Sequence, residues 1–236
     1  MVMNAAFFNA VRASLSDGRL SQKQMDVFNA IASAFDRYGD GDHRKFAYIL
    51  ATAWHETGRF RWLKEIWGPT ASQKRYEGRA DLGNTQPGDG KRFIGRGLVH
   101  ITGRHNYTDW AKRLGIDIVA KPELAERLDI AARILVQGMM LGTFTGKKLA
   151  DYIRSGTADY VEARRVVNGT DRAALIAGYA VKFQEAIEAS AKGIQPSKPS
   201  PAPSAPSDTK SLPGAPSALA IAIVLAVLVA VFLLNR

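Results

Sequence analysis

Two glutamates nine residues apart, Glu56 and Glu65, carry the clearest chemistry in the sequence. A pair of carboxylic side chains across a scissile glycosidic bond is the usual machinery of glycoside hydrolases, with one side chain acting as the general acid. Apolar residues recur at helical spacing from Phe46 to Trp54, just before Glu56. On a helical projection Glu56 falls at the edge of this apolar stripe. We therefore expect partial burial to raise its pKa, as a general acid requires.

The residue pattern alone leaves the second carboxylate open. Gly58 ends the helix, so the chain can fold back and let Glu65 face Glu56. Three other acidic residues in the glycine-rich loop that follows are rivals for the same role: Glu77, Asp81 and Asp89. His55 projects away from the apolar stripe and is free to line a cleft. The alternative interpretation of Glu56 is a surface glutamate in the last turn of a helix.

The elements that must position these residues are mostly helical. Ser21 and Gln24 have the spacing of a capping box, and Asp42 is suited to cap the next helix. Residues 60–95 are rich in glycine and are expected to form a loop with a short hairpin. Helical patterning then returns in residues 108–114, 122–128, 130–141, 158–167 and 173–189. The sequence thus predicts a mainly α fold, in which a small loop or β-hairpin region borders a cleft.

Composition divides the chain into three parts. We expect a catalytic domain in residues 1–190, a linker rich in Pro, Ser and Ala in residues 191–217, and a transmembrane helix in residues 218–234. The last segment has seventeen consecutive apolar residues, at the short end of what a bilayer core needs. This pattern predicts a single-pass protein of a host inner membrane or virion membrane, with the lipid bilayer as one partner.

Several classes of site are excluded or disfavoured by residue content. The absence of cysteine excludes disulfides, thiolate metal sites and a cysteine nucleophile. Position 59 is arginine, so His55 and Glu56 do not begin the zinc motif H-E-x-x-H, and the spacing of the four histidines fits no zinc site. No metal or cofactor is expected. The net charge of +10 indicates a polyanionic partner, such as a cell-wall polymer, an acidic lipid surface or nucleic acid.

Three motifs together resemble those of family 19 glycoside hydrolases, which include plant-type chitinases and phage endolysins. They are His55–Gly58, similar to the family's H-E-T motif; Gly95–Thr102 followed by Asn106-Tyr107; and Arg164–Gly169, which contains R-x-x-N-G. They occur in the family's order over about residues 46–185. The stretch Tyr76–Gly97 also looks like the phage endolysin branch.

The resemblance implies a lysozyme-like fold and an inverting mechanism. It implies that Glu56 is the general acid, that Glu65 is the general base and that Thr102 helps to hold the attacking water. It also places Asn106, Tyr107 and Asn168 in the sugar cleft, and it puts His100 where the family usually has a sugar-binding glutamine. Independently of the family, the exposed aromatic rings expected in the loop are suited to stack on sugars. The expected substrate-binding residues are therefore His55, Trp62, Trp67, His100, Asn106, Tyr107 and Asn168.

The chain lacks the cysteines and longer loops of plant chitinases, which favours bacterial peptidoglycan glycan strands as the substrate. The leading hypothesis is an endolysin or muramidase that serves phage-type host lysis or infection. Rival hypotheses are a lytic transglycosylase, a chitinase and a non-catalytic lysis-accessory membrane protein. Nucleic-acid binding is the weakest hypothesis, and no specific nucleic-acid partner is expected.

Overall fold

Helix α3, His43–Glu56, is the central helix of the computed structural model, which describes residues 3–193. Every residue from Lys45 to Trp54 in this helix is buried, so it packs on all sides and not along one stripe. Asp42 accepts a hydrogen bond from the Arg44 amide and begins the helix, as the sequence predicts. Glu56 is its last residue, so this carboxyl group lies at the end of the central helix of the core.

The larger core lies among five helices. Helix α3 packs against α8, α2 packs against α7, and α1 packs against α8. The predicted capping box of Ser21 and Gln24 begins α2. Helix α3 also contacts α2 and α7. The other four helices of this core are α1, Ala5–Ser14; α2, Gln22–Tyr38; α7, Leu128–Leu141; and α8, Ala173–Ala191.

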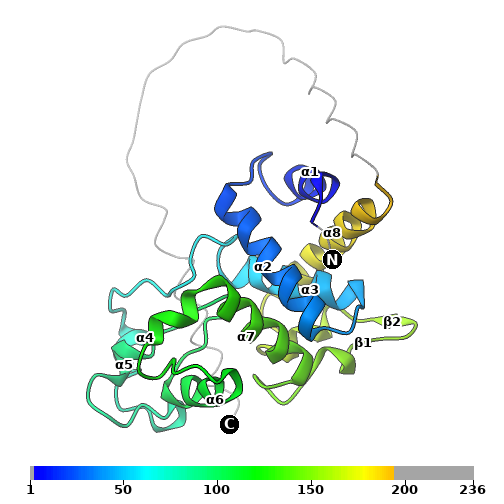
Figure 1. Cartoon of the computed structure of the whole chain (residues 1–236). Coiled ribbons are helices and arrows are strands. Elements are labelled where there is room, and N and C mark those ends of the chain that lie inside the picture. The colour runs from blue at the N-terminus through cyan, green and yellow to red at the C-terminus, as the bar shows by residue number, and fades with distance from the viewer. Residues whose placement is uncertain (1–2, 194–236) are drawn as a thin grey trace, which may run out of the picture. The chain divides into compact units, whose positions relative to one another are not determined.

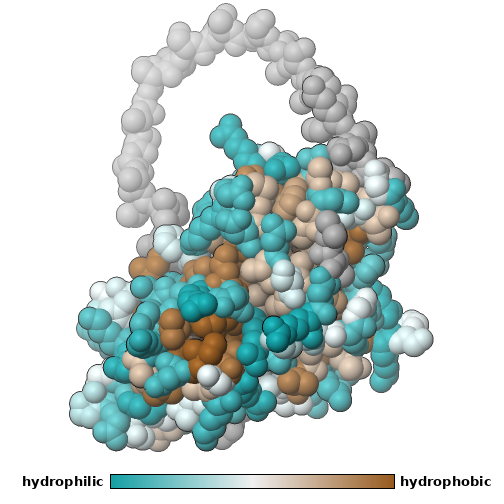
Figure 2. Space-filling model, viewed as in Figure 1, coloured by the Kyte–Doolittle hydropathy of each residue, from teal (hydrophilic) through white to brown (hydrophobic). Residues whose placement is uncertain are grey.

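A second, smaller core lies beside the start of α7. Its members include Phe93, Ile101, Tyr107 and Trp110, all of them buried. Figure 1 shows α4, α5 and α6 grouped at one end of the domain, away from α1. The bounds of these three helices are α4, Ala71–Lys74; α5, Asp89–Arg92; and α6, Arg104–Leu114. In Figure 2 the surface over α4 and α5 is coloured mostly teal to white, so it is largely hydrophilic.

The segment between α7 and α8 departs from the predicted helix over residues 158–167. It contains strands β1, Ile153–Arg154, and β2, Thr157–Ala158, in an antiparallel hairpin, followed by a 3-10 turn at Glu162–Val166. Tyr160, Ala163 and Val166 are buried at a spacing of three residues. Such spacing fits the three residues per turn of a 3-10 helix as well as the α period, which explains the error. Further 3-10 turns are Ala80–Leu82, Pro122–Glu126 and Leu149–Asp151.

The expectation of a single-pass membrane protein needs correction. Among residues 3–193 no helix combines the length and the apolar character that crossing a bilayer requires. The expected linker and the apolar segment 218–234 lie outside the described residues. The predicted location in a host inner membrane or virion membrane therefore has no support from the described helices.

Candidate functional site

A sharp turn directly after Glu56 reverses the chain. The buried Thr57 donates its hydroxyl hydrogen to the Ala53 carbonyl at 2.6 Å and accepts one from the Phe60 amide at 2.9 Å. Residues 58–60 all have positive φ, at 56°, 64° and 63°. Only the first of them is glycine, and a left-handed conformation costs the other two roughly 1 kcal/mol each. Thr57 therefore holds the turn, a role that was not anticipated from the sequence.

Burial of Phe60 offsets the strain of this turn. Its ring is 1% exposed and packs edge-on against Phe28 and Trp54, with ring centroids 4.9 Å and 5.2 Å away. Burying a phenylalanine side chain contributes about 1.5–3 kcal/mol. The turn is thus anchored in the larger core, and the chain leaves it in a fixed direction toward Glu65.

Three short stretches of chain pair side by side beyond the turn. The Glu65 amide donates to the Gly95 carbonyl at 2.8 Å, and the Gly97 amide donates to the Leu63 carbonyl at 2.8 Å. Arg96 in turn bridges antiparallel to Ile101. These pairings are isolated bridges, and no described strand lies within residues 60–95, so the short hairpin expected there is not formed. The bridges fix the backbone of Glu65 against the stretch that contains the G-R-G motif.

Neutral donors surround the carboxylate of Glu65. Its Oε1 accepts hydrogen bonds from Gln73 Nε2 at 3.0 Å and from the Tyr76 hydroxyl at 3.2 Å, and its Oε2 accepts one from the Gly95 amide at 3.2 Å. Within residues 3–193, Glu65 forms no ion pair with lysine or arginine. Burial raises the pKa of Tyr76, and the neighbouring Glu65 charge acts in the same direction, so Tyr76 remains a hydrogen donor.

Thr102 and Glu65 both have side-chain atoms close to Gly95. A methyl group added at Gly95 would lie 3.3 Å from Thr102 Oγ1 and 3.5 Å from Glu65 Oε2. Both side chains therefore reach the same point beside Gly95, where the lack of a side chain leaves space for them. The Thr102 hydroxyl donates to the His100 carbonyl at 2.9 Å, which fixes its rotamer. The structure thus brings together Glu65 and Thr102, two of the three expected catalytic residues.

Glu56 is held by a buried arginine. Arg164 Nη1 donates to Glu56 Oε1 at 2.5 Å; the Arg164 side chain is fully buried and that of Glu56 is 10% exposed. Arg164 Nε also donates to the Asp171 carbonyl at 3.1 Å, which orients the guanidinium. The expectation for Glu56 considered burial alone and did not include this cation. Arg164 stands in the third motif, but its side chain was given no role from the sequence.

His55 stands half-buried beside this ion pair. Burial lowers its pKa; the Glu56 charge opposes the shift and the Arg164 charge adds to it. The imidazole is therefore neutral at neutral pH. A neutral imidazole can both donate and accept a hydrogen bond.

The rival acidic residues have structural partners. Glu77 accepts hydrogen bonds from the amides of Gly88, at 2.6 Å, and Gly90, at 2.8 Å, and so closes the loop around them. Asp81 pairs with Arg79 on the surface. These two carboxylates therefore have defined structural partners within the loop.

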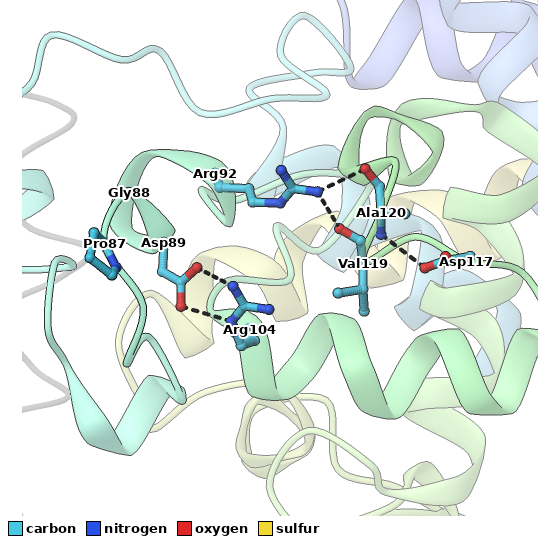
Figure 3. A pocket seen from close by; sticks show the side chains of 8 residues that line it. All are labelled: Pro87, Gly88, Asp89, Arg92, Arg104, Asp117, Val119 and Ala120. Carbon is cyan, nitrogen blue, oxygen red and sulfur yellow. Dashed lines mark hydrogen bonds and ion pairs between the residues drawn. The ribbon is translucent and has the colours of Figure 1, made fainter.

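Asp89 is likewise structural. It is 1% exposed and paired with Arg104, whose hydrogen bonds lower the pKa of the aspartate. Figure 3 shows this pair in a hollow of about 500 Å³ between the Pro87–Asp89 loop and the Asp117–Ala120 segment. No expected site residue lines this hollow. Among the four candidates for the second carboxylate, Glu65 is the one that lies beside Thr102.

The expected sugar-binding residues differ in exposure. Trp62 is 49% exposed, and its carbonyl lies 3.0 Å from His100 Nε2, so these two expected residues are neighbours. Asn106 is exposed and donates to the Thr102 carbonyl at 2.7 Å, whereas Trp67 and Asn168 are half-buried.

Tyr107 is the exception among them. Its ring is fully buried in the smaller core, and its hydroxyl donates to the Ile94 carbonyl at 2.9 Å while accepting from Arg96 at 3.0 Å. A ring so enclosed does not contact a sugar. The expectation is corrected accordingly: Tyr107 is a structural residue. Its ring packs in the smaller core, and its hydroxyl bonds the backbone next to Gly95, as a buried tyrosine can.

Comparison with known proteins relates the chain to glycan-cleaving enzymes. A glycosyl hydrolase family 19 domain-containing protein of Haemophilus influenzae is 30% identical over 138 residues, which cover 47% of this chain and 68% of that protein. An endochitinase of Arabidopsis thaliana is 31% identical over 129 residues, covering 53% of this chain and 43% of that protein. The chain thus spans less than half the length of the plant relative. No protein-family model matches the chain.

Solved structures share the fold. Chitinase C from Streptomyces griseus superposes with a TM-score of 0.58 at 20% identity, covering 78% of this chain and 76% of that chain. A bacterial family 19 chitinase superposes with a TM-score of 0.55 at 21% identity, covering 83% of this chain and 97% of that one. The helical architecture around α3 is therefore one that chitinases have.

Proposed function

The chain belongs to glycosyl hydrolase family 19, and on that basis we propose that it hydrolyses the β-1,4 glycan strands of bacterial peptidoglycan. One observation carries the proposal: two carboxyl groups, at Glu56 and Glu65, are held in different environments. Arg164 anchors the first, and neutral donors hold the second beside Thr102. Acid–base hydrolysis requires such a division of roles between two carboxyl groups.

Glu56 is the proposed general acid. Arg164 engages Oε1, and Oε2 has no hydrogen-bond partner among residues 3–193. Oε2 is therefore the oxygen that takes up a proton and delivers it to the leaving glycosidic oxygen. Arg164 is then a positioning residue that keeps Oε2 in one orientation.

Glu65 is the proposed general base. Three hydrogen bonds fix its carboxylate without neutralising its charge by an ion pair, so it retains the capacity to accept a proton from water. Thr102 Oγ1 faces the same space beside Gly95 and is available to hold the same water. Attack by this water on the anomeric carbon, opposite the departing oxygen, gives inversion of configuration.

Digestion of purified peptidoglycan, followed by mass spectrometry of the fragments, tests the proposal. Hydrolysis adds one water per cut and leaves reducing ends, whereas a transglycosylase leaves anhydromuramic ends without added water. Reducing-end products that disappear in a Glu56→Gln variant would support the proposal. Anhydro products, or products that persist in the variant, would refute it.

Chitin is the second candidate substrate. The plant relative is an endochitinase, and the solved structures that share the fold are chitinases. The described residues include no disulfide, because the chain has no cysteine. Parallel digestion of chitin oligomers and peptidoglycan under one condition ranks the two substrates by kcat/KM. A higher value on peptidoglycan is expected.

The biological role that we propose is bacteriolysis of the endolysin type. It rests on the likeness of Tyr76–Gly97 to that branch and on the proposed wall substrate. Addition of the protein to permeabilised bacteria should lower their turbidity, and Glu56→Gln should abolish this effect. Unchanged turbidity in the presence of active enzyme would rule out the role.

A further inference from the structure

Positive charge is concentrated around Glu65. Residues 59–104, which include Glu65 and Thr102, contain ten lysines and arginines but only four acidic residues. Three of these acids are engaged: Glu77 with backbone amides, Asp81 with Arg79 and Asp89 with Arg104. The stretch therefore presents an excess of unneutralised cations.

Five of these cations form what we call the basic rim. All five are exposed, and within residues 3–193 none of them forms an ion pair with an acidic side chain. Arg92 donates to the Val119 and Ala120 carbonyls at 3.0 Å and 2.8 Å, and Arg75 donates to the Ser72 hydroxyl at 3.1 Å. These acceptors are neutral, so all five charges remain uncompensated and available to an anionic ligand. The basic rim consists of Arg61, Lys74, Arg75, Lys91 and Arg92.

The rim adjoins the proposed general base. Lys74 and Arg75 stand between Gln73 and Tyr76, the two side chains that donate to Glu65 Oε1. Helix α5, which bears the two remaining helical members of the rim, packs against α4, and Figure 1 shows the two helices as neighbours. Arg61 precedes the exposed Trp62. Lys74 and Arg75 therefore lie next to the donors of Glu65, and the α5 members of the rim extend the positive charge toward the hollow of Figure 3, which Arg92 lines.

We propose that the basic rim binds acidic groups carried by the substrate itself, namely the free carboxylates of the peptides attached to the wall glycan. This inference rests on the proposed function and specifies its substrate class. A neutral polymer such as chitin gains nothing from the five cations, whereas a wall strand presents carboxylates along its length. Nucleic acid is the less favoured ligand, because the rim borders a site built for sugars.

The rim predicts a selective dependence on ionic strength. Exposed ion pairs contribute roughly 0.2–1 kcal/mol each, which corresponds to about a 1.4- to 5-fold change in affinity. Salt screens such pairs over about 10 Å or less. Three lost contacts should therefore weaken wall binding about tenfold, and added salt should reproduce most of that loss in the unmodified chain.

The experiment compares two triple variants of the full chain with equal loss of charge. One is Lys74→Gln/Arg75→Gln/Lys91→Gln in the rim; the control is Lys112→Gln/Lys147→Gln/Lys192→Gln, at exposed positions elsewhere. Cosedimentation with purified peptidoglycan gives Kd at low and high salt. The same walls with their carboxylates converted to neutral methylamides, and a duplex DNA, are the alternative ligands.

We expect about a tenfold higher Kd for the rim variant on native walls, less than a twofold change for the control, and loss of this difference on amidated walls or in high salt. Equal effects of the two triples, equal binding of native and amidated walls, or tighter binding to DNA than to walls would overturn the inference. Binding is measured without hydrolysis. A chain that binds walls through the rim but does not cleave them would therefore contradict the proposed function alone.

Discussion

Arg164 and Glu56 form a buried ion pair, with Nη1 and Oε1 2.5 Å apart, across 108 positions of sequence. The guanidinium has no exposed surface, and its Nη2 has no hydrogen-bond partner among residues 3–193. The pair joins the end of α3 to the turn before α8. It therefore connects the stability of the fold with the orientation of the proposed acid.

Removal of Arg164 should both destabilise the protein and inactivate it. Breaking a buried ion pair by removing one partner costs about 3–5 kcal/mol, because the remaining charge has no counter-ion. We expect Arg164→Ala to lower the free energy of unfolding by that amount in urea titrations. Arg165→Ala is the matched control; its exposed pair with Glu162 should contribute less than about 1 kcal/mol.

A double-mutant cycle with Glu56→Gln isolates the pair. If Arg164 acts through Glu56, its loss should cost less once the carboxylate is replaced by an uncharged amide. Glu56→Gln alone should reduce kcat by about 10²–10⁴-fold and leave the circular dichroism spectrum unchanged. Strict additivity of the two stability changes would show that the contact has no coupling energy.

The second prediction separates Glu65 from Glu77. Glu65→Gln removes the proposed base and should reduce kcat by about 10²–10⁴-fold. Glu77→Gln disturbs only the amides of Gly88 and Gly90 and should reduce kcat less than about tenfold. The measurement is the initial rate of reducing-end formation on peptidoglycan. The opposite order of the two variants would move the base to Glu77.

A lowered pKa at Asp89 predicts how the fold responds to acid. Hydrogen bonds from Arg104 hold the pKa of this carboxyl below its usual 3.8. Its carboxylate form thus stabilises the fold fully above pH 3.8, and this contribution is lost as pH falls through the lower folded-state pKa. Asp89→Asn should therefore cost about 2 kcal/mol at neutral pH and progressively less in acid.

Urea titrations of Asp89→Asn at neutral and acid pH check this dependence. Asp81→Asn serves as the control, because Asp81 also pairs with an arginine but lies on the surface. A much smaller effect is expected from it. A cost for Asp89→Asn that does not change with pH would mean that the carboxylate form has no special part in the fold.

Local patterns in the sequence predicted the helical frame well. The capping box of Ser21 and Gln24 and the cap at Asp42 act within a few residues, so they can be identified from the sequence alone. The spacing of apolar residues placed Glu56 at the end of a buried helix. The predicted apolar stripe was nevertheless too narrow, because α3 packs against α2, α7 and α8 and is buried on every face from Lys45 to Trp54.

The contacts that build the site are long-range and escaped local reasoning. The partner of Glu56 lies at residue 164, and nothing in the spacing of charges indicates that pair. Tyr107 was expected against sugar, yet the fold turns its ring into the smaller core. The choice of Glu65 over Asp89 as the second carboxylate likewise depends on the fold. Only the folded structure brings Arg104 against Asp89. Local patterns specify elements, and packing between distant segments specifies the site.

The last prediction concerns Gly95, beside which the Glu65 and Thr102 side chains lie. A methyl group there would lie 3.1 Å from the His100 Cβ and 3.3 Å from Thr102 Oγ1, so both side chains would have to move by a few tenths of an ångström. Reacting groups held for in-line attack tolerate such displacement poorly; a shift of about 1 Å costs about 10²-fold. We therefore expect Gly95→Ala to lower kcat about tenfold with little change in KM. Gly178→Ala, in an exposed turn of α8 with no atom within 4 Å of the added carbon, should leave kcat unchanged and add up to about 1 kcal/mol of stability. Full activity of Gly95→Ala would mean that Glu65 and Thr102 do not share the attacking water, because the added methyl group would then have no consequence for the reaction.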